Sequence, residues 1–386
     1  MRLPENKVKE LIALMNSVSN GGIPPQPPIL ELFDLAMDEK TVDFLLAVGS
    51  EPKTLRQLEE DYTAMGGEDW PAFWQRVLTM SFLHPMNNTQ RHLYQITPIF
   101  PGWVEFFTAG PRTPEREAVL NKFLEFWNSL RQLNKSPIRE MLDGAVMKDI
   151  ANGVPPKTTV RGVVEESRSI ALSQPLQSVQ QVLTAGDVYD LLSRHPEEIA
   201  IANCFCRQYK KINTEADCGQ GIPLESCMAI GVIAKHLVEN GTARYISYEE
   251  AVQKMAFFED HGCIHTTFHN HNDAGDEAIA ICNCCADCCL LYSGYRTANI
   301  SKLYVRALHV PQMVDESNCV GCNKCGKACP TAATYYDREA KKLVFDYDKC
   351  IGCGQCVHQC PFEVRKMVPG RRDVFLKTLK PEEALA

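Results

Sequence analysis

The chain has 386 residues, a formal net charge of −8 and an apolar content of 45%. This length predicts two or three domains with apolar cores, and the net negative charge argues against an electrostatic nucleic-acid binder. The sequence has no secretory h-region and no run of eighteen apolar residues, so it predicts neither secretion nor membrane insertion. Eighteen cysteines then indicate metal-thiolate chemistry rather than disulfides, in the reducing cytoplasm of an anaerobe or microaerophile.

Residues 1–28 predict a short helical start and a stiff proline-rich connector, GGIPPQPP. Residues 29–112 predict a compact unit of helices followed by a hairpin. Thr54 is placed to cap one short helix, and Asp69 precedes a second helix with Pro71 in its first turn. The hairpin is expected to turn at Asn87-Asn88. This order of elements resembles a winged helix-turn-helix.

The charges of the winged unit disfavour DNA as its partner. Its second helix brings mainly Arg76 as a cation, whereas a helix that enters a groove normally brings several to the phosphates. We therefore expect this unit to dock a protein or a second copy of the chain. The acidic residues between positions 51 and 112 outnumber the basic ones: Glu51, Glu59, Glu60, Asp61, Glu68, Asp69 and Glu105 against Lys53, Arg56, Arg76, Arg91 and Arg112.

Residues 113–152 are predicted to form a helical connector that Thr113-Pro114 opens. Its apolar residues recur at helical spacing, which predicts either packing on the winged unit or a seam between two copies of the chain. The sequence leaves both open, so a homodimer through the N-terminal helices remains one expectation. The stripe consists of Val119, Leu120, Phe123, Leu124, Trp127 and Leu130.

Residues 153–306 form a predicted mixed α/β domain that is rich in cysteine. We expect a helix near Asp187 to Arg194, a helical pattern from Cys227 to Gly241, and a capping box at Ser247 and Glu250 that opens another helix. Nine cysteines here are candidate metal ligands: Cys204, Cys206, Cys218, Cys227, Cys282, Cys284, Cys285, Cys288 and Cys289.

Three interpretations of these nine cysteines compete: further iron–sulfur clusters, a zinc site, or redox-active thiols. Adjacent thiolates concentrate negative charge, which is tolerable only beside a metal cation or a side chain such as Arg207. We favour at least one additional cluster, with zinc as the alternative. By count, Cys204, Cys206, Cys218 and Cys227 suffice for one cubane. The five later cysteines then complete that cluster or hold another one, including a non-cubane form.

The histidines from His261 to His271 and the thiol of Cys263 lie between these cysteines. His265 is the best candidate for a neighbour of a cluster or a proton carrier, whereas His269 and His271 are equally typical of a polar loop.

The order C-x-C-R, two later cysteines, Gly-x-x-His and I-C-N-C-C-x-x-C-C resembles a group of multi-cysteine ferredoxin-like proteins of anaerobic bacteria and archaea. Cys263 stands where that pattern has an aliphatic residue. The resemblance implies iron–sulfur binding and redox work.

Residues 307–370 contain two copies of C-x2-C-x2-C-x3-C-P, and each cysteine of the second lies 31 positions after its counterpart in the first. Zinc ribbons use separated C-x2-C pairs instead. The segment resembles a two-cluster bacterial-type ferredoxin domain, in which the fourth cysteine of each motif serves the other cluster. Asp337 to Ala340 are expected to turn between two strands. The predicted ligand sets are Cys319, Cys322, Cys325 and Cys360 for one 4Fe-4S cluster, and Cys350, Cys353, Cys356 and Cys329 for the other.

The sequence therefore predicts an α+β multidomain protein, with a short tail at 371–386, that transfers electrons to or from a partner oxidoreductase or redox protein. Two alternatives stay open: an oxidoreductase whose cysteine-rich domain binds substrate at a cluster, and a redox-sensing winged-helix regulator. No acid–base pair or nucleophile stands out, so no catalytic residue is assigned.

Overall fold

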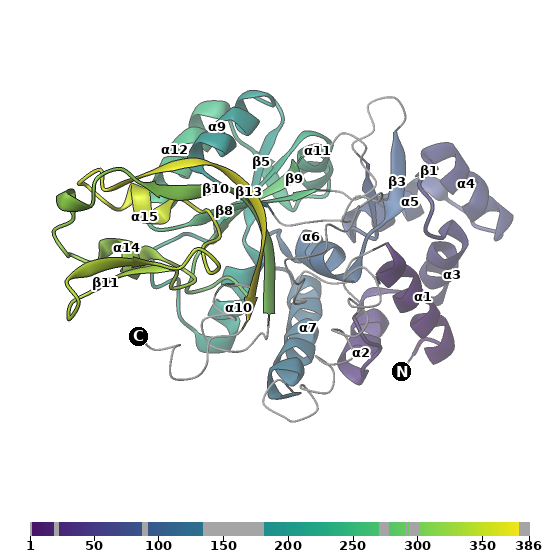
Figure 1. Ribbon diagram of the computed structural model, residues 1–386. Coiled ribbons are helices and arrows are strands. Elements are labelled where there is room, and N and C mark those ends of the chain that lie inside the picture. The colour runs from purple at the N-terminus through teal and green to yellow at the C-terminus, as the bar shows by residue number, and fades with distance from the viewer. Residues whose placement is uncertain are drawn as a thin grey trace.

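A computed structural model describes residues 2–18, 23–86, 92–133, 181–269, 278–290, 292 and 302–377. Helices and sheets are mixed, as the α+β prediction requires. The N-terminal helices lie at one end of the molecule, a large sheet crosses its middle, and the segment with the ferredoxin-type motifs lies at the opposite end (Figure 1). None of the described helices is long and apolar enough to cross a membrane.

The N-terminal part consists of helices around a small three-stranded sheet of order β1-β3-β2. The turn expected at Asn87-Asn88 lies outside the described residues, but its two strands pair antiparallel as predicted. The elements are α1 (Glu5–Ser17), α2 (Pro27–Ala36), α3 (Glu39–Val48), β1 (Lys53–Thr54), α4 (Leu55–Ala64), α5 (Trp70–Thr79), β2 (Leu83–Pro85), β3 (Leu93–Ile96), the π-helix η1 (Ile99–Trp103), α6 (Val104–Thr108) and α7 (Pro114–Leu133).

Local capping explains where two of these helices begin. Thr54 forms a complete capping box with Gln57 at the start of α4. Asp69 adopts a left-handed conformation, and its side chain accepts a hydrogen bond from the backbone N–H of Ala72 at the start of α5. Each cap satisfies a backbone donor that the first turn of a helix leaves without a partner. The Thr54 cap is where the sequence predicted it, and α5 begins after Asp69 with Pro71 in its first turn, as expected.

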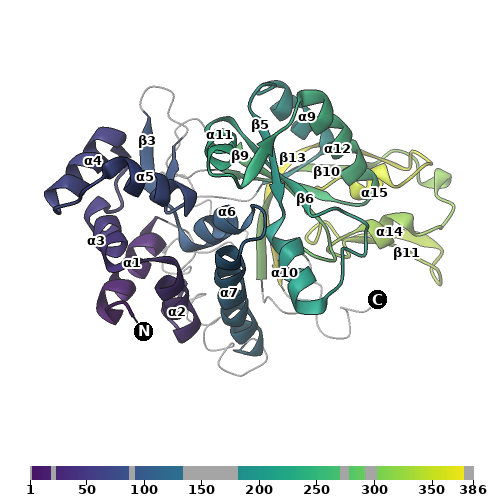
Figure 2. The same ribbon diagram turned by 180° about the vertical axis from the view of Figure 1, so that it is seen from behind.

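Four residues of the apolar stripe of α7, namely Val119, Leu120, Phe123 and Leu124, are buried within the chain. Val119 and Phe123 are fully buried, and α7 packs against α2 and α6. Phe205 and Tyr209 of the middle part join the same apolar core, and the Tyr209 hydroxyl donates to Asn128 Oδ1 at 2.8 Å. Helices α7 and α10 (Phe205–Thr214) therefore lie side by side (Figure 2). The stripe packs inside the chain, which is one of the two arrangements that the sequence left open.

Glu105 makes the stability of the N-terminal part depend on pH. Burial raises the pKa of its carboxyl group to about 8, although the side chain accepts a hydrogen bond from the Gly102 N–H at 2.7 Å. Glu105 ionises at a lower pH in the unfolded chain than in the folded chain, so its contribution to the free energy of unfolding falls as the pH rises from about 4.5 to about 8 and is then level. We expect Glu105→Gln to stabilise the protein at pH 9 by about 2 kcal/mol and to have little effect at pH 4.5. Urea unfolding at both pH values measures this, and equal effects at the two would contradict it.

The middle of the molecule is an eight-stranded sheet of order β13-β10-β4-β8-β9-β6-β5-β7. Most neighbouring strands are antiparallel, and β4 and β10 are parallel. The strands are β4 (Gln181–Leu183), β5 (Ile199–Asn203), β6 (Glu225–Ile230), β7 (Ala243–Tyr245), β8 (Ile264–His269), β9 (Ala278–Cys284), β10 (Lys302–Met313) and β13 (Arg365–Lys377). The helices of this part are α9 (Ala185–Ser193), α10, α11 (Gly231–Glu239) and α12 (Tyr248–Asp260).

One helix boundary in this part differs from the prediction. The helical pattern was expected to start at Cys227, but Cys227 lies in β6, between β5 and β9, and α11 starts only at Gly231. Pairing on both sides of a buried strand outweighs local helical periodicity. The predicted helix near Asp187 and the Ser247 cap of α12 are present, and the Ser247 side chain accepts from Glu250 N–H.

The ferredoxin-type segment is inserted in the chain between two neighbouring strands of this sheet, β10 and the edge strand β13. Strands β10 and β13 pair along their length, from Lys302 opposite Lys377 to Met313 opposite Arg365, and the segment connects their far ends. The domain limits expected at 306/307 and 370/371 therefore fall inside strands. The reason is that the flanking residues of the segment complete the sheet of the middle part rather than forming linkers. The strand–turn–strand expected around Asp337–Ala340 is present as β11 (Thr334–Asp337) and β12 (Lys342–Phe345).

Candidate metal centres

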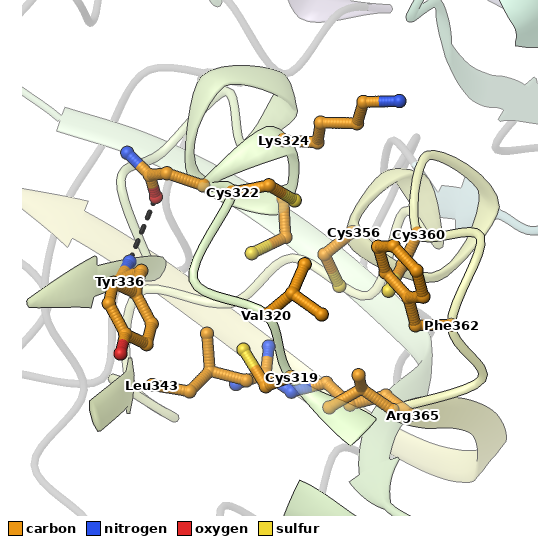
Figure 3. A pocket seen from close by; sticks show the side chains of 13 residues that line it. Cys319, Val320, Cys322, Lys324, Tyr336, Leu343, Cys356, Cys360, Phe362 and Arg365 are labelled. Atoms are coloured by element: carbon orange, nitrogen blue, oxygen red, sulfur yellow. Dashed lines mark hydrogen bonds between the residues drawn. The ribbon is translucent and has the colours of Figure 1, made fainter. Parts of the chain in front are cut away.

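Four cysteines of the ferredoxin-type segment form the outer group, at the far end of the molecule: Cys319, Cys322, Cys325 and Cys360. They line one pocket of the segment, together with Cys356 and Arg365 (Figure 3). Cys325 lies in the short helix α14 (Lys324–Ala328). Cys322 is exposed, so this group borders solvent.

The other four cysteines form the inner group: Cys329, Cys350, Cys353 and Cys356. Electrostatic interactions link their sulfurs to one another, and burial with these interactions raises the pKa of Cys353 well above its ordinary value. Backbone N–H groups donate to two of the sulfurs, from Ala333 to Cys329 at 3.1 Å and from Gly352 to Cys350 at 3.4 Å. Such bonds stabilise sulfur that carries negative charge. The chain thus brings together the sets predicted from spacing, with Cys356 also reaching the outer pocket.

Two arginines that the sequence analysis missed face these groups. Arg365 is 7% exposed and interacts with Cys325 and Cys356, which belong to different groups. Arg372 interacts with Cys350 and donates to its backbone carbonyl. Both lie in β13, so only the pairing of β13 with β10 carries them back to the cysteines. The sequence does contain a signal for them, because basic residues cluster soon after the last Cys-Pro, at Arg365, Lys366, Arg371 and Arg372.

Beside the inner group, the backbone at position 352 leaves room only for glycine. Gly352 has a positive φ of 72°, and a Cβ atom there would overlap the backbone carbonyl oxygen of His309 in β10. Gly354 also has a positive φ, of 79°, but a Cβ atom there would meet nothing closer than 3.8 Å.

We expect Gly354→Ala to lower the free energy of unfolding by about 1 kcal/mol from backbone strain alone. Gly352→Ala adds overlap with backbone, and we expect it to cost about 2–4 kcal/mol and to lower the iron content. Iron analysis and unfolding of the two variants test this, and equal effects would contradict it.

Six of the middle cysteines form a closed ring of neighbouring sulfurs, the cysteine ring. Thiol contacts link Cys204 to Cys206 and Cys227, and link Cys282 to Cys227 and Cys284. Cys289 closes the ring by contacts with Cys206 and Cys284. All eighteen cysteines of the chain lie in its described part, and none forms a disulfide.

The local structure explains why these six sulfurs meet. Cys282 and Cys284 lie two residues apart on β9 and so share one face of the sheet, and Cys227 lies opposite Cys282 on β6. Cys204 is the N-cap residue of α10, and Cys206 lies in its first turn. The positive end of the helix dipole therefore points toward the ring. The hydrogen bond to Cys227 raises the pKa of Cys282 well above its ordinary value, and a bound cation would stabilise several thiolates this close together.

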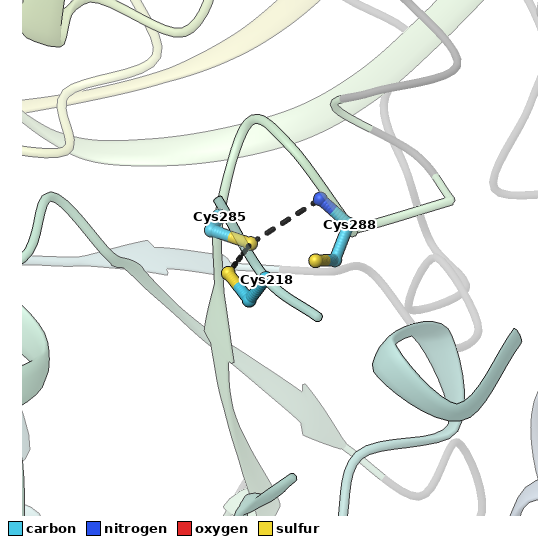
Figure 4. A group of neighbouring side chains, drawn as sticks. All are labelled: Cys218, Cys285 and Cys288. Atoms are coloured by element: carbon cyan, nitrogen blue, oxygen red, sulfur yellow. Dashed lines mark hydrogen bonds between the residues drawn. The ribbon is translucent and has the colours of Figure 1, made fainter. Parts of the chain in front are cut away.

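The remaining three candidates form a separate, tighter group, the cysteine trio of Cys218, Cys285 and Cys288. Their sulfur atoms all lie within 4.8 Å of one another and point toward a common centre (Figure 4). Cys218 therefore lies with two of the later cysteines. Of the four cysteines that by count sufficed for one cubane, the structure places Cys204, Cys206 and Cys227 in the cysteine ring and Cys218 in the trio. The loop around Cys218 folds back onto the turn after β9, where the Gly219 N–H donates to Asp287 Oδ2 at 2.7 Å.

Arg207 lies between the ring and the trio and is only 4% exposed. Its guanidinium donates to Ser226 Oγ at 2.6 Å and to the Asn283 carbonyl at 2.9 Å. Burial acts to lower the pKa of Arg207, but the sulfurs of the ring and the trio, chiefly Cys204 and Cys285, raise it above its ordinary value. A single buried cation thus faces both groups of sulfurs.

Two of the other residues singled out from the sequence, Cys263 and His265, lie near this cation. Cys263 is fully buried, with its sulfur 3.9 Å from Arg207, and it belongs to neither group. Burial lowers the pKa of His265 to about 4, and its Nδ1 pairs with Asn283 Oδ1 at 2.8 Å. His261 lies at the end of α12 and pairs with the Phe257 carbonyl, and His269 ends β8. His271 lies outside the described residues.

The inner group and the ring are neighbours in space. Tyr292 is fully buried in one apolar cluster that contains Cys353 of the inner group and Cys284 and Cys289 of the ring. The helix α15 (Gln355–His358) also holds the segment against the end of α12, because Gln355 Nε2 donates to the carbonyl of Glu259 in α12 at 3.3 Å and to the carbonyl of Cys263, just after α12, at 2.7 Å. The order in space is therefore solvent, outer group, inner group, Tyr292, ring, Arg207 and trio.

Comparison with known proteins adds one finding. Residues 312–361 match the family described as 4Fe-4S dicluster domain. No curated protein and no solved structure matches the chain. The matched residues hold all eight cysteines of the outer and inner groups, so the C-terminal segment is a ferredoxin-like domain that binds 4Fe-4S iron–sulfur centres.

Proposed function

We propose that this protein is a multi-centre iron–sulfur electron carrier that exchanges electrons with a partner oxidoreductase. The outer and inner groups hold one 4Fe-4S cluster each, and the cysteine ring holds a further iron–sulfur centre. Such clusters supply reversible one-electron transfer, tuned by hydrogen bonds to sulfur, nearby charge and burial. The observation that carries the proposal is that Tyr292 is buried in one apolar cluster with Cys284 and Cys289 of the ring, and that Cys353 of the inner group packs against the same cluster.

The surroundings of these groups suit a carrier. The outer group has an exposed cysteine, Cys322, where a partner can approach, whereas the inner group has a buried one, Cys350, and its Gly352 lies against His309 of β10. Arginines face every group that we assign to iron, namely Arg365 and Arg372 in the ferredoxin-like domain and Arg207 beside the ring. A positive charge stabilises the reduced state of a nearby cluster, because reduction adds one negative charge.

The N-terminal part is proposed to be a winged helix-turn-helix that docks a protein or a second copy of the chain. The element order and the sheet order β1-β3-β2 support this. Arg76, the main cation of α5, lies 3.5 Å from Asp38 of the same unit, so its charge is already paired. This pairing further weakens DNA as the partner.

Reversible reduction followed by electron transfer to a protein acceptor tests the proposed function. Anaerobically purified protein is reduced chemically, freed of reductant and mixed with cytochrome c as a general acceptor. We expect more than two electrons per chain to be taken up and returned, because the ring adds to the two ferredoxin-like centres. Irreversible bleaching, or uptake that requires a small organic substrate, would instead favour the enzyme alternative.

A further inference from the structure

The cysteine trio is separated from the cysteine ring by the geometry of one strand and one turn. Cys284 is the last residue of β9, and its side chain shares the face of the sheet that Cys282 presents to the ring. The next residue, Cys285, points to the opposite side, as alternation requires. In the following turn Cys288 joins the trio and its neighbour Cys289 joins the ring. The run CNCCADCC therefore contributes cysteines to both the ring and the trio.

The spacing of the trio fits a single tetrahedral ion. The sulfurs of Cys218 and Cys285 are 3.7 Å apart, and all three sulfurs lie within 4.8 Å of one another. Zinc binds thiolate at about 2.3 Å in a tetrahedron, which places two sulfurs about 3.8 Å apart. In a cubane each cysteine binds a different iron at an outer corner, so its sulfurs are spread more widely. Among the described residues, no other group of three metal-binding side chains is this compact.

Backbone donors support the sulfurs of the trio. The Cys288 N–H donates to Cys285 Sγ at 3.3 Å, and the N–H groups of Gln220 and Ile222 reach Cys218. These bonds stabilise thiolate and fix the direction of each sulfur, as outer-shell contacts do at metal sites. They require the loop after Cys218 and the turn after β9 to take these conformations together.

The charges around the trio balance those of a bound divalent cation. Lys210 lies 2.5 Å from Asp287 and interacts with Cys288 and Cys218, and Arg207 interacts with Cys285. Three thiolates, one zinc ion and Asp287 carry two net negative charges, and Lys210 with Arg207 supplies two positive ones. Cys218 is only partly buried, which leaves one side of the site open to a small ligand.

We propose that Cys218, Cys285 and Cys288 bind one zinc ion, separate from the iron–sulfur centres, with the fourth position open to water or another small exogenous ligand. Zinc sites with three protein ligands and an open position polarise or activate what binds there. This inference does not depend on the electron-carrier proposal, because zinc takes no part in electron transfer.

Metal analysis of variants of the full chain tests the site. We expect about one zinc per chain in the purified protein, and X-ray absorption at the zinc edge to show three sulfur neighbours at about 2.3 Å and one lighter neighbour. Cys285→Ser is expected to lower the zinc content at least about tenfold and to keep the iron content. The partly exposed Cys218→Ser, which is least able to disturb folding, should do the same. Cys282→Ser in the ring should lose iron and keep zinc.

Cys263→Ser is the matched control, because Cys263 is a buried cysteine near the trio but outside it. It should retain zinc, and loss of zinc in this variant would overturn the open fourth position. Loss of iron and sulfide from Cys285→Ser, or a wild-type protein that neither contains nor takes up zinc, would overturn the zinc site itself. Failure of the electron-carrier proposal would appear separately, in the iron content and in reduction.

Discussion

Replacing Arg207 by methionine is expected to empty the middle metal centres and to destabilise the chain. Methionine keeps much of the volume but removes the buried charge that faces both the ring and the trio, and it leaves Ser226 Oγ and the Asn283 carbonyl without their donor. Removing one partner of a buried ionic network costs about 3–5 kcal/mol. Any ring centre that survives should have a lower reduction potential, because the nearby positive charge is gone. Iron and zinc analysis, urea unfolding and redox titration measure these effects.

Arg207→Lys is the matched control. Lysine keeps the charge but not the planar fork that reaches two acceptors, so we expect it to retain metal better than methionine and to lose part of the stability. A methionine variant with full metal content, unchanged stability and an unshifted potential would show that Arg207 does not compensate the sulfurs.

Replacing Cys353 by serine is expected to remove the centre of the inner group, about four irons per chain. Cys353 is also the residue of this group that packs in the cluster around Tyr292. A protein donor can approach only the surface, so the ring should then be reduced far more slowly than in the wild type. Stopped-flow mixing with a reduced flavodoxin, followed by freeze-quench spectroscopy of the iron centres, measures this rate.

Cys322→Ser provides the comparison for Cys353→Ser. This variant should also lose about four irons per chain, but from the outer group, where Cys322 is exposed. It leaves unchanged the apolar cluster in which Tyr292 packs with cysteines of the inner group and the ring. Donors small enough to reach the inner group directly should therefore still reduce the ring in this variant. Equal rates for Cys353→Ser and the wild type would contradict the path through Tyr292.

Local features of the fold followed from the sequence because short-range chemistry determines them. The cap at Thr54, the start of α5 after Asp69, the start of α7 at Pro114, and the strand–turn–strand at Asp337 all depend on residues within a few positions of one another. The repeated cysteine spacing likewise predicted which eight residues gather in the ferredoxin-like domain, because each motif is a single loop.

The features that the sequence did not predict depend on contacts between residues that are distant along the chain. The start of α11 was misplaced because Cys227 is held in a strand by β5 and β9, which no local pattern reveals. The division of the middle cysteines into ring and trio follows from the alternation of β9 and from the return of the Cys218 loop to Asp287. Arg365 and Arg372 reach the cysteines only because β13 pairs with β10.

Iron and acid-labile sulfide per chain, measured on anaerobically purified protein, test the central claim most directly. The ferredoxin-like domain alone accounts for about eight irons, since each of two cubanes carries four. A further iron–sulfur centre in the cysteine ring predicts more than eight, and about twelve if that centre also has four irons, with sulfide rising in parallel. A value of eight in fully loaded protein would show that the ring holds no iron, and would contradict an electron path that extends into the middle of the molecule.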